Sequence, residues 1–256
     1  MKVPGEYAKI MLPELTFPYL IPGQEVLLDD GKIHLKIVEK AENVTENGGE
    51  NTQEKRYFAK VLWGGLLKSR KSAALPGAKI YPPTLTNSDL ANIKIAKEMG
   101  VTGVMQPFVR DHSDLECVKE ALREAGAEDI RLFAKIENMD GVRKLEKLLP
   151  AADEIVIARG DLGNAVHLWD LPGVQRQISE KCRAAGKPFM VVTQMLASME
   201  RSPVPTRAEV NDIFHAVMDG AASIMVTGET AVGDYPVEVI RYMVNTVRSA
   251  EKEENR

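Results

Sequence analysis

Residues 131–161 read RLFAKIENMDGVRKLEKLLPAADEIVIARGD, and this stretch decides the fold class. It contains a short apolar run, a polar segment of helical character, and a second apolar run. A strand, a helix and a second strand in this order form a right-handed unit with two parallel strands. The first run ends in two ionisable residues, Lys135 and Glu137, separated by one position. Because side chains alternate along a strand, both charges are expected to point to the same side of it.

The same alternation of strand and helix patterns continues from about residue 80 to the end of the chain. Five apolar runs are expected to form strands: Val101–Val109, Ile130–Glu137, Glu154–Gly160, Pro188–Met195 and Ser223–Thr230. Polar segments are expected to form helices at Asn87–Met99, Ser113–Ala125, Gly141–Leu149, Leu171–Ala185, Thr206–Met218 and Val237–Glu251. Helix stop signals follow four of them, at Gly100, Gly126, Gly186 and Gly220. This order predicts an α/β fold with a parallel sheet.

Polar residues at the carboxyl ends of four strands distinguish between two versions of that fold. They are Lys135 with Glu137, Arg159 with Asp161, Thr193 with Gln194, and Glu229 with Thr230. Open α/β sheets and barrels both build their sites at this end of the strands. An open sheet could use five strands, whereas a barrel needs eight to close. The placement of the polar residues favours the barrel family, so we expect a (β/α)8 TIM-barrel type fold that is incomplete, with about five of eight strands.

The region before residue 80 has a different character. Turn-forming sequences separate short β-rich runs at Glu25–Leu28, Lys32–Val38 and Tyr57–Leu62, and Asp30-Gly31 is a hairpin signal between the first two. The polar segment 41–55 is expected to be an exposed connection. We therefore divide the chain into a small, β-rich, lid-like domain at residues 1–79 and the barrel part at residues 80–256.

Composition narrows the class of protein. The chain has 256 residues, of which 44% are hydrophobic and 27% are charged, and its formal net charge is −4. This mild charge argues against nucleic acid or an anionic membrane as the main partner. There is no apolar run of about 20 residues and no signal-peptide pattern. The two cysteines predict no disulfide framework. We expect a cytoplasmic protein.

Lys135, Glu137 and Asp161 are the strongest candidates for a site. A strand-end ion pair such as Lys135 with Glu137 is often only a weak surface contact. Asp161 raises the probability of a site because it lies between Gly160 and Gly163, where backbone N–H groups can approach an anion. Two carboxylates on neighbouring strand ends suit Mg²⁺, and a lysine beside them suits the negative charge that develops on a substrate oxygen.

Two further polar residues are open to a structural and a functional interpretation. Thr193 is either a β-branched strand residue or a group that bonds substrate or relays a proton. Arg159 is either a tie between loops or part of the site. The sequence contains neither GxGxxG nor GxxxxGK[ST], the two nucleotide-binding glycine patterns.

Several long segments, in this order, resemble the pyruvate kinase family. They are AKIENMDGV, IARGDLG, GKPFMVVTQMLASM, SPVPTRAE and MVTGETAVGDYPVE, and upstream of them IPGQEVLLDDGKIHLKI and VLWGGLLKSRKSAALPG. The resemblance covers nearly the whole chain. It implies transfer of a phosphoryl group from phosphoenolpyruvate to ADP, giving pyruvate and ATP, with Mg²⁺ (or Mn²⁺) and usually K⁺.

The resemblance also implies a role for each matching residue. Glu137 and Asp161 would ligate the divalent metal, and Lys135 would stabilise charge on the phosphoryl group and the enolate. The N–H groups of Gly160 and Asp161 would hold the substrate carboxylate. Thr193 would lie beside the methylene carbon that receives a proton.

This sequence departs from the family pattern in several places. Lys71, in KSAALPG, matches a lid-domain lysine on the nucleotide side, but Ser72 and Ala74 replace a glycine and an asparagine. Pro107 stands where the family usually has a serine near the potassium site, which weakens the expectation of K⁺. The family normally has three further barrel strands at its start, which supply an arginine on the phosphoryl group, and a regulatory domain at its end; from the resemblance we expect neither within these residues.

Three functions follow from these observations. The first is a pyruvate kinase-like phosphotransferase that is partial or depends on an assembly. The second is a metal-dependent lyase or aldolase of the pyruvate-enolate type, and the third is a non-catalytic phosphoenolpyruvate-binding protein. Unpaired sheet edges associate readily. The expected partner is therefore another copy, in a homo-oligomer, or a chain that supplies the missing strands.

Overall fold

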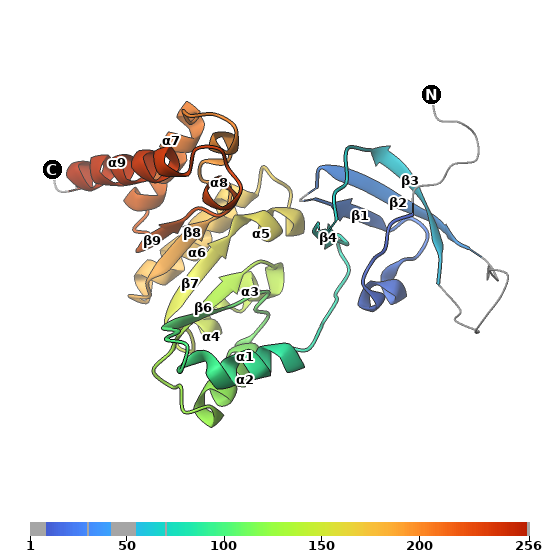
Figure 1. The fold of residues 1–256 in the computed structure, drawn as a ribbon, viewed down its shortest axis with the longest axis horizontal. Helices are drawn as coiled ribbons and strands as arrows, with labels where there is room; N and C mark the ends of the chain where they lie inside the picture. Colours follow the sequence, from blue (N-terminus) through green and yellow to red (C-terminus); the bar gives the residue numbers. More distant parts are fainter. Residues whose placement is uncertain (1–8, 30, 42–54, 70, 255–256) are drawn as a thin grey trace. The chain divides into compact units, whose positions relative to one another are not determined.

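The computed structural model describes residues 9–29, 31–41, 55–69 and 71–254. The chain divides into two compact units, residues 1–82 and 83–256, and each is described by itself (Figure 1). Most of the connection expected at 41–55 lies outside the described residues. None of the helices in the described ranges combines the length and the apolar character that crossing a membrane requires.

The first unit is built on a four-stranded antiparallel sheet with the order β3-β2-β1-β4. Its strands are β1 (Glu25–Leu28), β2 (Ile33–Lys40), β3 (Tyr57–Trp63) and β4 (Ala73–Ala74), preceded by the 3₁₀ helix η1 (Glu14–Tyr19). The core lies on one face of the sheet, where alternate residues are buried: Val26, Leu28, Ile33, Leu35 and Ile37. The predicted β-rich character and the β1–β2 hairpin are confirmed, although Asp30 of the expected turn lies outside the described residues.

The second unit contains a five-stranded parallel sheet with the order β5-β6-β7-β8-β9. The strands are β5 (Gly103–Gln106), β6 (Arg131–Ile136), β7 (Glu154–Ala158), β8 (Phe189–Val192) and β9 (Ser223–Met225). Each strand pairs with its neighbour in the sequence, and β5 and β9 form the two ends of the sheet among the described residues. The predicted α/β fold is therefore confirmed, and the sheet is the open wall of an incomplete barrel.

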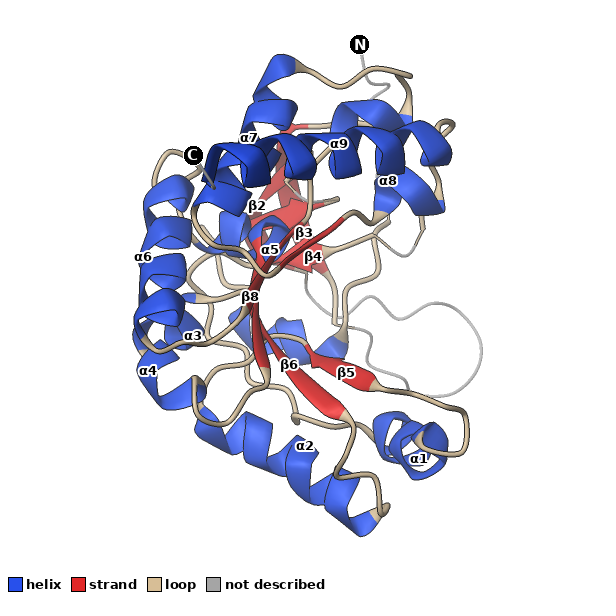
Figure 2. Ribbon diagram, turned by 90° about the vertical axis from the view of Figure 1, so that its left-hand side faces the viewer, coloured by secondary structure: helices blue, strands red, loops and turns tan. Residues whose placement is uncertain are grey.

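The helices of the second unit follow the sheet along one side, as Figure 2 shows for α2, α4, α6 and α7. The longer ones are α1 (Asn87–Ala96), α2 (His112–Glu124), α6 (Leu171–Ala184), α7 (Arg207–Met218) and α9 (Pro236–Glu254). The shorter ones are α3 (Met139–Arg143), α4 (Leu145–Leu148), α5 (Arg159–Ala165), η2 (Ala197–Glu200) and α8 (Gly228–Ala231). The main core joins helices and strands, and its fully buried side chains include Leu115, Leu132, Ile136, Ile157 and Ile178.

The opposite face of the sheet carries a second, smaller apolar cluster. Its buried residues are Val156 and Ala158 of β7 and Val192 of β8. Lys135 is paired with Val156 across the parallel ladder, so the two side chains are on the same face of the sheet. The helix-covered face thus holds the main core, whereas the other face carries the ionisable residues.

The predicted element boundaries were wrong in several places. The segment Gly141–Leu149 is two short helices, because the backbone of Lys144 leaves the helical region. The strand predicted to reach Gly160 ends at Ala158, and Arg159 already begins α5. The strand predicted over Ser223–Thr230 ends at Met225, and Glu229 and Thr230 lie in α8. A helix as short as α5 or α8 contains too few residues to show the 3.6-residue pattern by which a helix is recognised in a sequence.

Candidate active site

Lys135 and Glu137 form an ion pair at the carboxyl end of β6. The Lys135 Nζ atom lies 2.7 Å from Glu137 Oε1. The lysine side chain is 25% exposed and the glutamate side chain only 2%. The pair is therefore not the weak surface contact that a strand-end lysine and glutamate often make, since removing one partner would leave a charge in a nearly dry position.

The second carboxylate oxygen of Glu137 is also occupied. The backbone N–H of Phe108, in the loop after β5, donates to Glu137 Oε2 at 2.7 Å. Phe108 has a positive φ of 51°, a backbone conformation that non-glycine residues rarely adopt. The loop after β5 is thus turned so that one N–H group points at the carboxylate, which fixes Glu137 from two strands at once.

Asp161 lies in the first turn of α5, directly after β7. The sequence predicted it at the end of a strand, between two glycines, and gave no sign of this helix of seven residues. Because Ile136 of β6 pairs with Ile157 of β7, the ends that carry Glu137 and Asp161 are adjacent in the sheet. Among the described residues no group of three or more His, Cys, Asp or Glu side chains is arranged to hold a metal. Two carboxylates fit a hard cation that takes its other ligands from water and substrate, as Mg²⁺ does.

Thr193 follows β8 and contacts the start of α5. The N–H of Gly160 donates to Thr193 Oγ1 at 2.8 Å, and the hydroxyl donates to the Val192 carbonyl at 2.5 Å. The N–H group that the resemblance assigned to a substrate carboxylate is therefore hydrogen-bonded to a side chain of the protein itself. A carboxylate that binds at Gly160 would share this N–H group with the Thr193 hydroxyl.

Arg159 joins three elements at the same end of the sheet. Its Nη1 atom is 2.8 Å and 2.7 Å from the two carboxylate oxygens of Asp212 in α7. Its Nη2 atom donates to the Thr193 carbonyl and to the Met195 sulfur, both at 2.8 Å. Of the two interpretations of this arginine, the structure supports a tie between loops. Sequence reasoning did not find Asp212, which is 53 positions away and carries no motif of its own.

Lys71 belongs to the first unit, whereas the other five predicted site residues belong to the second. Its Nζ atom lies 2.8 Å from Asp29 Oδ1. The hydrogen bond from Lys71 holds the pKa of the Asp29 carboxyl below its usual value. Asp29 itself has a positive φ of 50° at the start of the β1–β2 turn. The assignment of Lys71 to a nucleotide remains a prediction.

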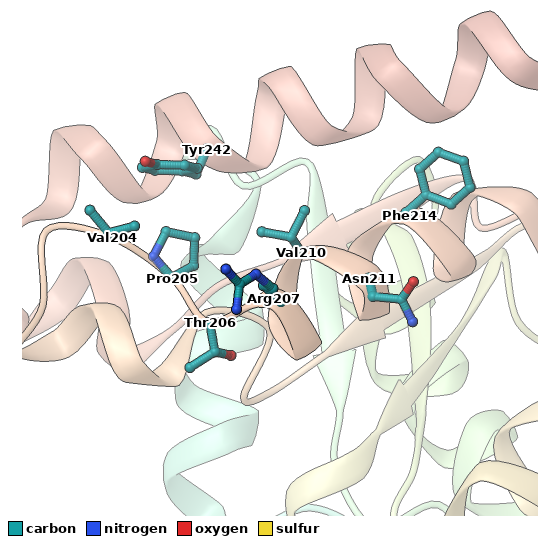
Figure 3. Close-up of a pocket in the computed structure, with 8 residues that line it drawn as sticks. All are labelled: Val204, Pro205, Thr206, Arg207, Val210, Asn211, Phe214 and Tyr242. Carbon is teal, nitrogen blue, oxygen red and sulfur yellow. The ribbon is translucent and has the colours of Figure 1, made fainter.

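Glu229, which was predicted at the end of the last strand and lies in α8, is held by backbone groups of the protein. It is buried, and it accepts hydrogen bonds from the N–H groups of Leu196 at 3.2 Å and Thr227 at 2.8 Å. Its carboxylate therefore braces the loops after β8 and β9. A cavity of about 400 Å³ lies between α7 and α9, and none of the predicted site residues lines it (Figure 3). Apolar and aromatic groups such as Val204, Phe214 and Tyr242 form most of its wall.

Comparison with known proteins identifies this arrangement. The family model described as pyruvate kinase, barrel domain, matches residues 7–240. The chain is 38% identical to a pyruvate kinase of Bacillus licheniformis, over 90% of this chain and 38% of the relative. It is 40% identical to one of Geobacillus stearothermophilus, again over 90% of this chain and 38% of the relative. A pyruvate kinase of Clostridium acetobutylicum is 35% identical over 91% of this chain and 47% of the relative.

An α/β barrel wall with its ionisable residues at the carboxyl ends of the strands is the arrangement of a barrel enzyme. The chain belongs to the pyruvate kinase family. It spans about two fifths of the length of the first two relatives.

Proposed function

We propose that this chain carries the phosphoenolpyruvate side of a pyruvate kinase site and takes part in phosphoryl transfer from phosphoenolpyruvate to ADP. The buried Lys135–Glu137 pair supports this function most directly. It lies at the carboxyl ends of parallel strands, in a chain of this family. In the reaction, the bond between phosphorus and the enol oxygen breaks, a bond to a terminal oxygen of ADP forms, and the enolate takes a proton at its methylene carbon.

Lys135 is the group that meets the negative charge of this reaction. Its ammonium group stabilises the phosphoryl oxygens and the enolate oxygen on which charge develops. Thr193 lies beside the methylene carbon, where its hydroxyl orients the proton that is transferred. The hydrogen bond from Gly160 to Thr193 supports a shared site, because substrate carboxylate and threonine hydroxyl then meet at the same N–H group. The Asp161 N–H supplies a second donor to that carboxylate.

Glu137 and Asp161 are the residues that would hold the divalent cation, Mg²⁺ or Mn²⁺. Their carboxylates come from adjacent strand ends and offer only oxygen ligands. When bound, the cation would neutralise charge on the substrate oxygens and orient them. Lys135 and the Phe108 N–H group already hold the Glu137 carboxylate in one orientation. Binding a cation would therefore cost little further conformational entropy at this side chain. Pro107 argues against K⁺ as a second requirement.

ADP and ATP are the proposed nucleotides, and Lys71 is the residue of the first unit that we propose to contact them. The proposed macromolecular partner is a second copy or another chain that pairs with the open sheet. Exposed apolar side chains in and after the two end strands support association: Met105 in β5, Phe108 in the loop that follows it, and Val232 and Val237 in the segment after β9. A molar mass from light scattering equal to one 28.3 kDa chain would contradict association with a second copy.

A half-reaction tests the site without the nucleotide. Protonation of the enolate is reversible, so the lysine, the threonine and the divalent cation together should exchange the methyl protons of pyruvate with D₂O. We expect Mg²⁺-dependent exchange by NMR in the presence of phosphate, and a loss of about 10²–10³-fold in Lys135→Ala. Arg176→Ala, on the exposed side of α6, is a control of the same kind that should exchange normally.

The complete reaction is tested beside it by pyruvate formation from phosphoenolpyruvate and ADP, with and without K⁺. Turnover that is absent in Lys135→Ala supports the phosphotransferase. Methyl exchange without turnover would assign the chain the enolate chemistry and place the nucleotide contacts on a partner. A folded sample that neither exchanges pyruvate protons nor binds oxalate, a dianion shaped like the enolate, would overturn the proposed function.

A further inference from the structure

Two consecutive non-glycine residues after β8 have left-handed backbones. Thr193 has a φ of 72° and Gln194 a φ of 54°. A β-branched residue is a genuine outlier in this region, because its side chain crowds the neighbouring carbonyl. Such a conformation persists only where surrounding contacts determine it, and it often marks a site. Some group of the protein must therefore hold Thr193 in place.

Arg159 provides that contact. Its guanidinium group donates to the Thr193 carbonyl at 2.8 Å, and the same nitrogen reaches the Met195 sulfur two residues later. The arginine side chain is 12% exposed, so it is confined rather than mobile. Two hydrogen bonds to Asp212, at 2.8 Å and 2.7 Å, fix the other side of the group to α7. The guanidinium group thus holds the backbone carbonyl before Gln194 and the side-chain sulfur of the residue after it.

The same arrangement aims the Thr193 hydroxyl. Gly160 directly follows Arg159, and its N–H donates to Thr193 Oγ1 at 2.8 Å. A Cβ atom added at Gly160 would lie 3.6 Å from the methyl carbon of Thr193, so the two residues are packed against each other. The first two residues of α5 therefore hold Thr193, one at its carbonyl and one at its hydroxyl.

We propose that Arg159 is a positioning residue that, anchored by Asp212, keeps Thr193 in its left-handed conformation and its hydroxyl at Gly160. Both terminal nitrogens of the guanidinium group are hydrogen-bonded within the protein, Nη1 to Asp212 and Nη2 to Thr193 and Met195, so we assign Arg159 an action through Thr193 rather than on the phosphoryl group. A planar fork is needed, because donors must point at a carboxylate on one side and at a carbonyl on the other. A lysine offers one nitrogen and cannot replace it. The consequence for proton transfer rests on the proposed function; the conformational role does not.

The first test compares Arg159→Lys in two backgrounds, the natural chain and Thr193→Gly. Glycine adopts a positive φ without strain. In the Thr193→Gly background the hydrogen bond from Arg159 to the carbonyl of residue 193 is therefore not needed to hold a strained conformation. We expect Arg159→Lys to lower the melting temperature clearly in the natural chain and markedly less in Thr193→Gly. An equal loss in both backgrounds would overturn the proposal, because a tie between Arg159 and Asp212 alone does not depend on residue 193.

The second test measures hydrogen exchange of the Gly160 amide by NMR, with Asp212→Asn as the second variant. We expect exchange at Gly160 to be about ten-fold faster in Arg159→Lys and in Asp212→Asn than in the natural chain, with the Ile157 amide of β7 unchanged. Parallel acceleration at both amides, or no acceleration at Gly160, would overturn the clamp.

The third readout is the methyl exchange of pyruvate. In Arg159→Lys and in Asp212→Asn the rate constant of exchange should fall. The apparent affinity for pyruvate should stay the same, because the groups that hold the anion and the cation remain. If the natural chain exchanges no pyruvate protons, the proposed function fails, whereas the melting and Gly160 measurements still decide the role of Arg159.

Discussion

Two buried glutamates on neighbouring strands lie at opposite ends of the parallel sheet. Glu154 begins β7, and Glu137 directly follows the end of β6. Both side chains are almost fully buried, at 7% and 2% exposed. Both also have a basic partner, Arg131 at 3.2 Å for Glu154 and Lys135 at 2.7 Å for Glu137. By composition and burial alone the two pairs look alike.

The other contacts of the two glutamates differ. Glu154 accepts a hydrogen bond from the Ser223 hydroxyl at 2.6 Å, which links β7 to β9 across the intervening strand. Its partners therefore all come from strands of the sheet. Glu137 is held by a loop N–H group and by a lysine on the face of the sheet opposite the main core. A carboxylate at the amino end of the sheet joins strands, and one at the carboxyl end is presented to the loops, where barrel enzymes have their sites.

The change with the largest expected effect is Glu137→Gln. The amide removes the negative charge that faces Lys135 and a proposed ligand of the cation. We expect the exchange of pyruvate methyl protons to fall by about 10²–10³-fold and Mn²⁺ affinity, followed by electron paramagnetic resonance, to fall with it. Exchange and Mn²⁺ affinity equal to those of the natural chain would remove Glu137 from the site and erase the difference between the two glutamates.

Glu154→Gln is the matched change at the other end of the sheet. The amide removes the negative charge that faces Arg131 and replaces one of the two accepting carboxylate oxygens by an NH₂ group, so the buried charge-assisted hydrogen bond is lost. We expect unfolding in urea to become easier by about 1–3 kcal/mol, with pyruvate exchange per folded molecule unchanged. A loss of exchange as large as that of Glu137→Gln would mean that the end of the sheet does not separate the two roles.

The two glutamates also show how far the sequence alone could lead. The common face of Lys135 and Glu137 was predictable, because alternation along a strand depends only on local geometry. The contact between Phe108 and Glu137 was not, since it needs a positive φ that the sequence MQPFVR does not specify. Thr193 was found by its place after a strand, but its bond to Gly160 depends on a helix too short to recognise. Asp212 stayed hidden because only the folded chain brings α7 to Arg159.

A third buried carboxylate, Asp114 in α2, sharpens the comparison. It lies after β5, at the carboxyl end, but its oxygens accept hydrogen bonds from Arg110 and Thr84. Burial alone would raise the pKa of Asp114, and the hydrogen bonds from Arg110 and Thr84 outweigh it, lowering the pKa from 3.8 to about 2. A buried carboxylate at the carboxyl end of the sheet can therefore have a structural role, and its hydrogen-bond partners as well as its position distinguish that role from a role in the site.

Acid unfolding tests this assignment. Because the folded pKa lies below the unfolded one, Asp114 stabilises the fold above pH 3.8, and this contribution is lost as the pH falls toward 2. It amounts to about 2 kcal/mol. Asp114→Asn should lower stability at pH 6 and flatten the loss between pH 4 and pH 2, measured by urea midpoints at each pH. An acid limb as steep as that of the natural chain would show that Asp114 is not the group that titrates there.

The smallest effect is expected for the exposed pair Arg176–Glu180 on α6, which sets the baseline for the buried pairs. Its nitrogen and oxygen are 2.9 Å apart, as close as in the buried pairs, but the side chains are 75% and 53% exposed. Water and salt screen such a pair, and holding two long side chains together costs entropy. Glu180→Gln should shift the melting temperature by about 1 °C or less, and raising the salt concentration should remove even that shift. A shift as large as that of Glu154→Gln would mean that distance, and not burial, determines what an ion pair contributes in this protein.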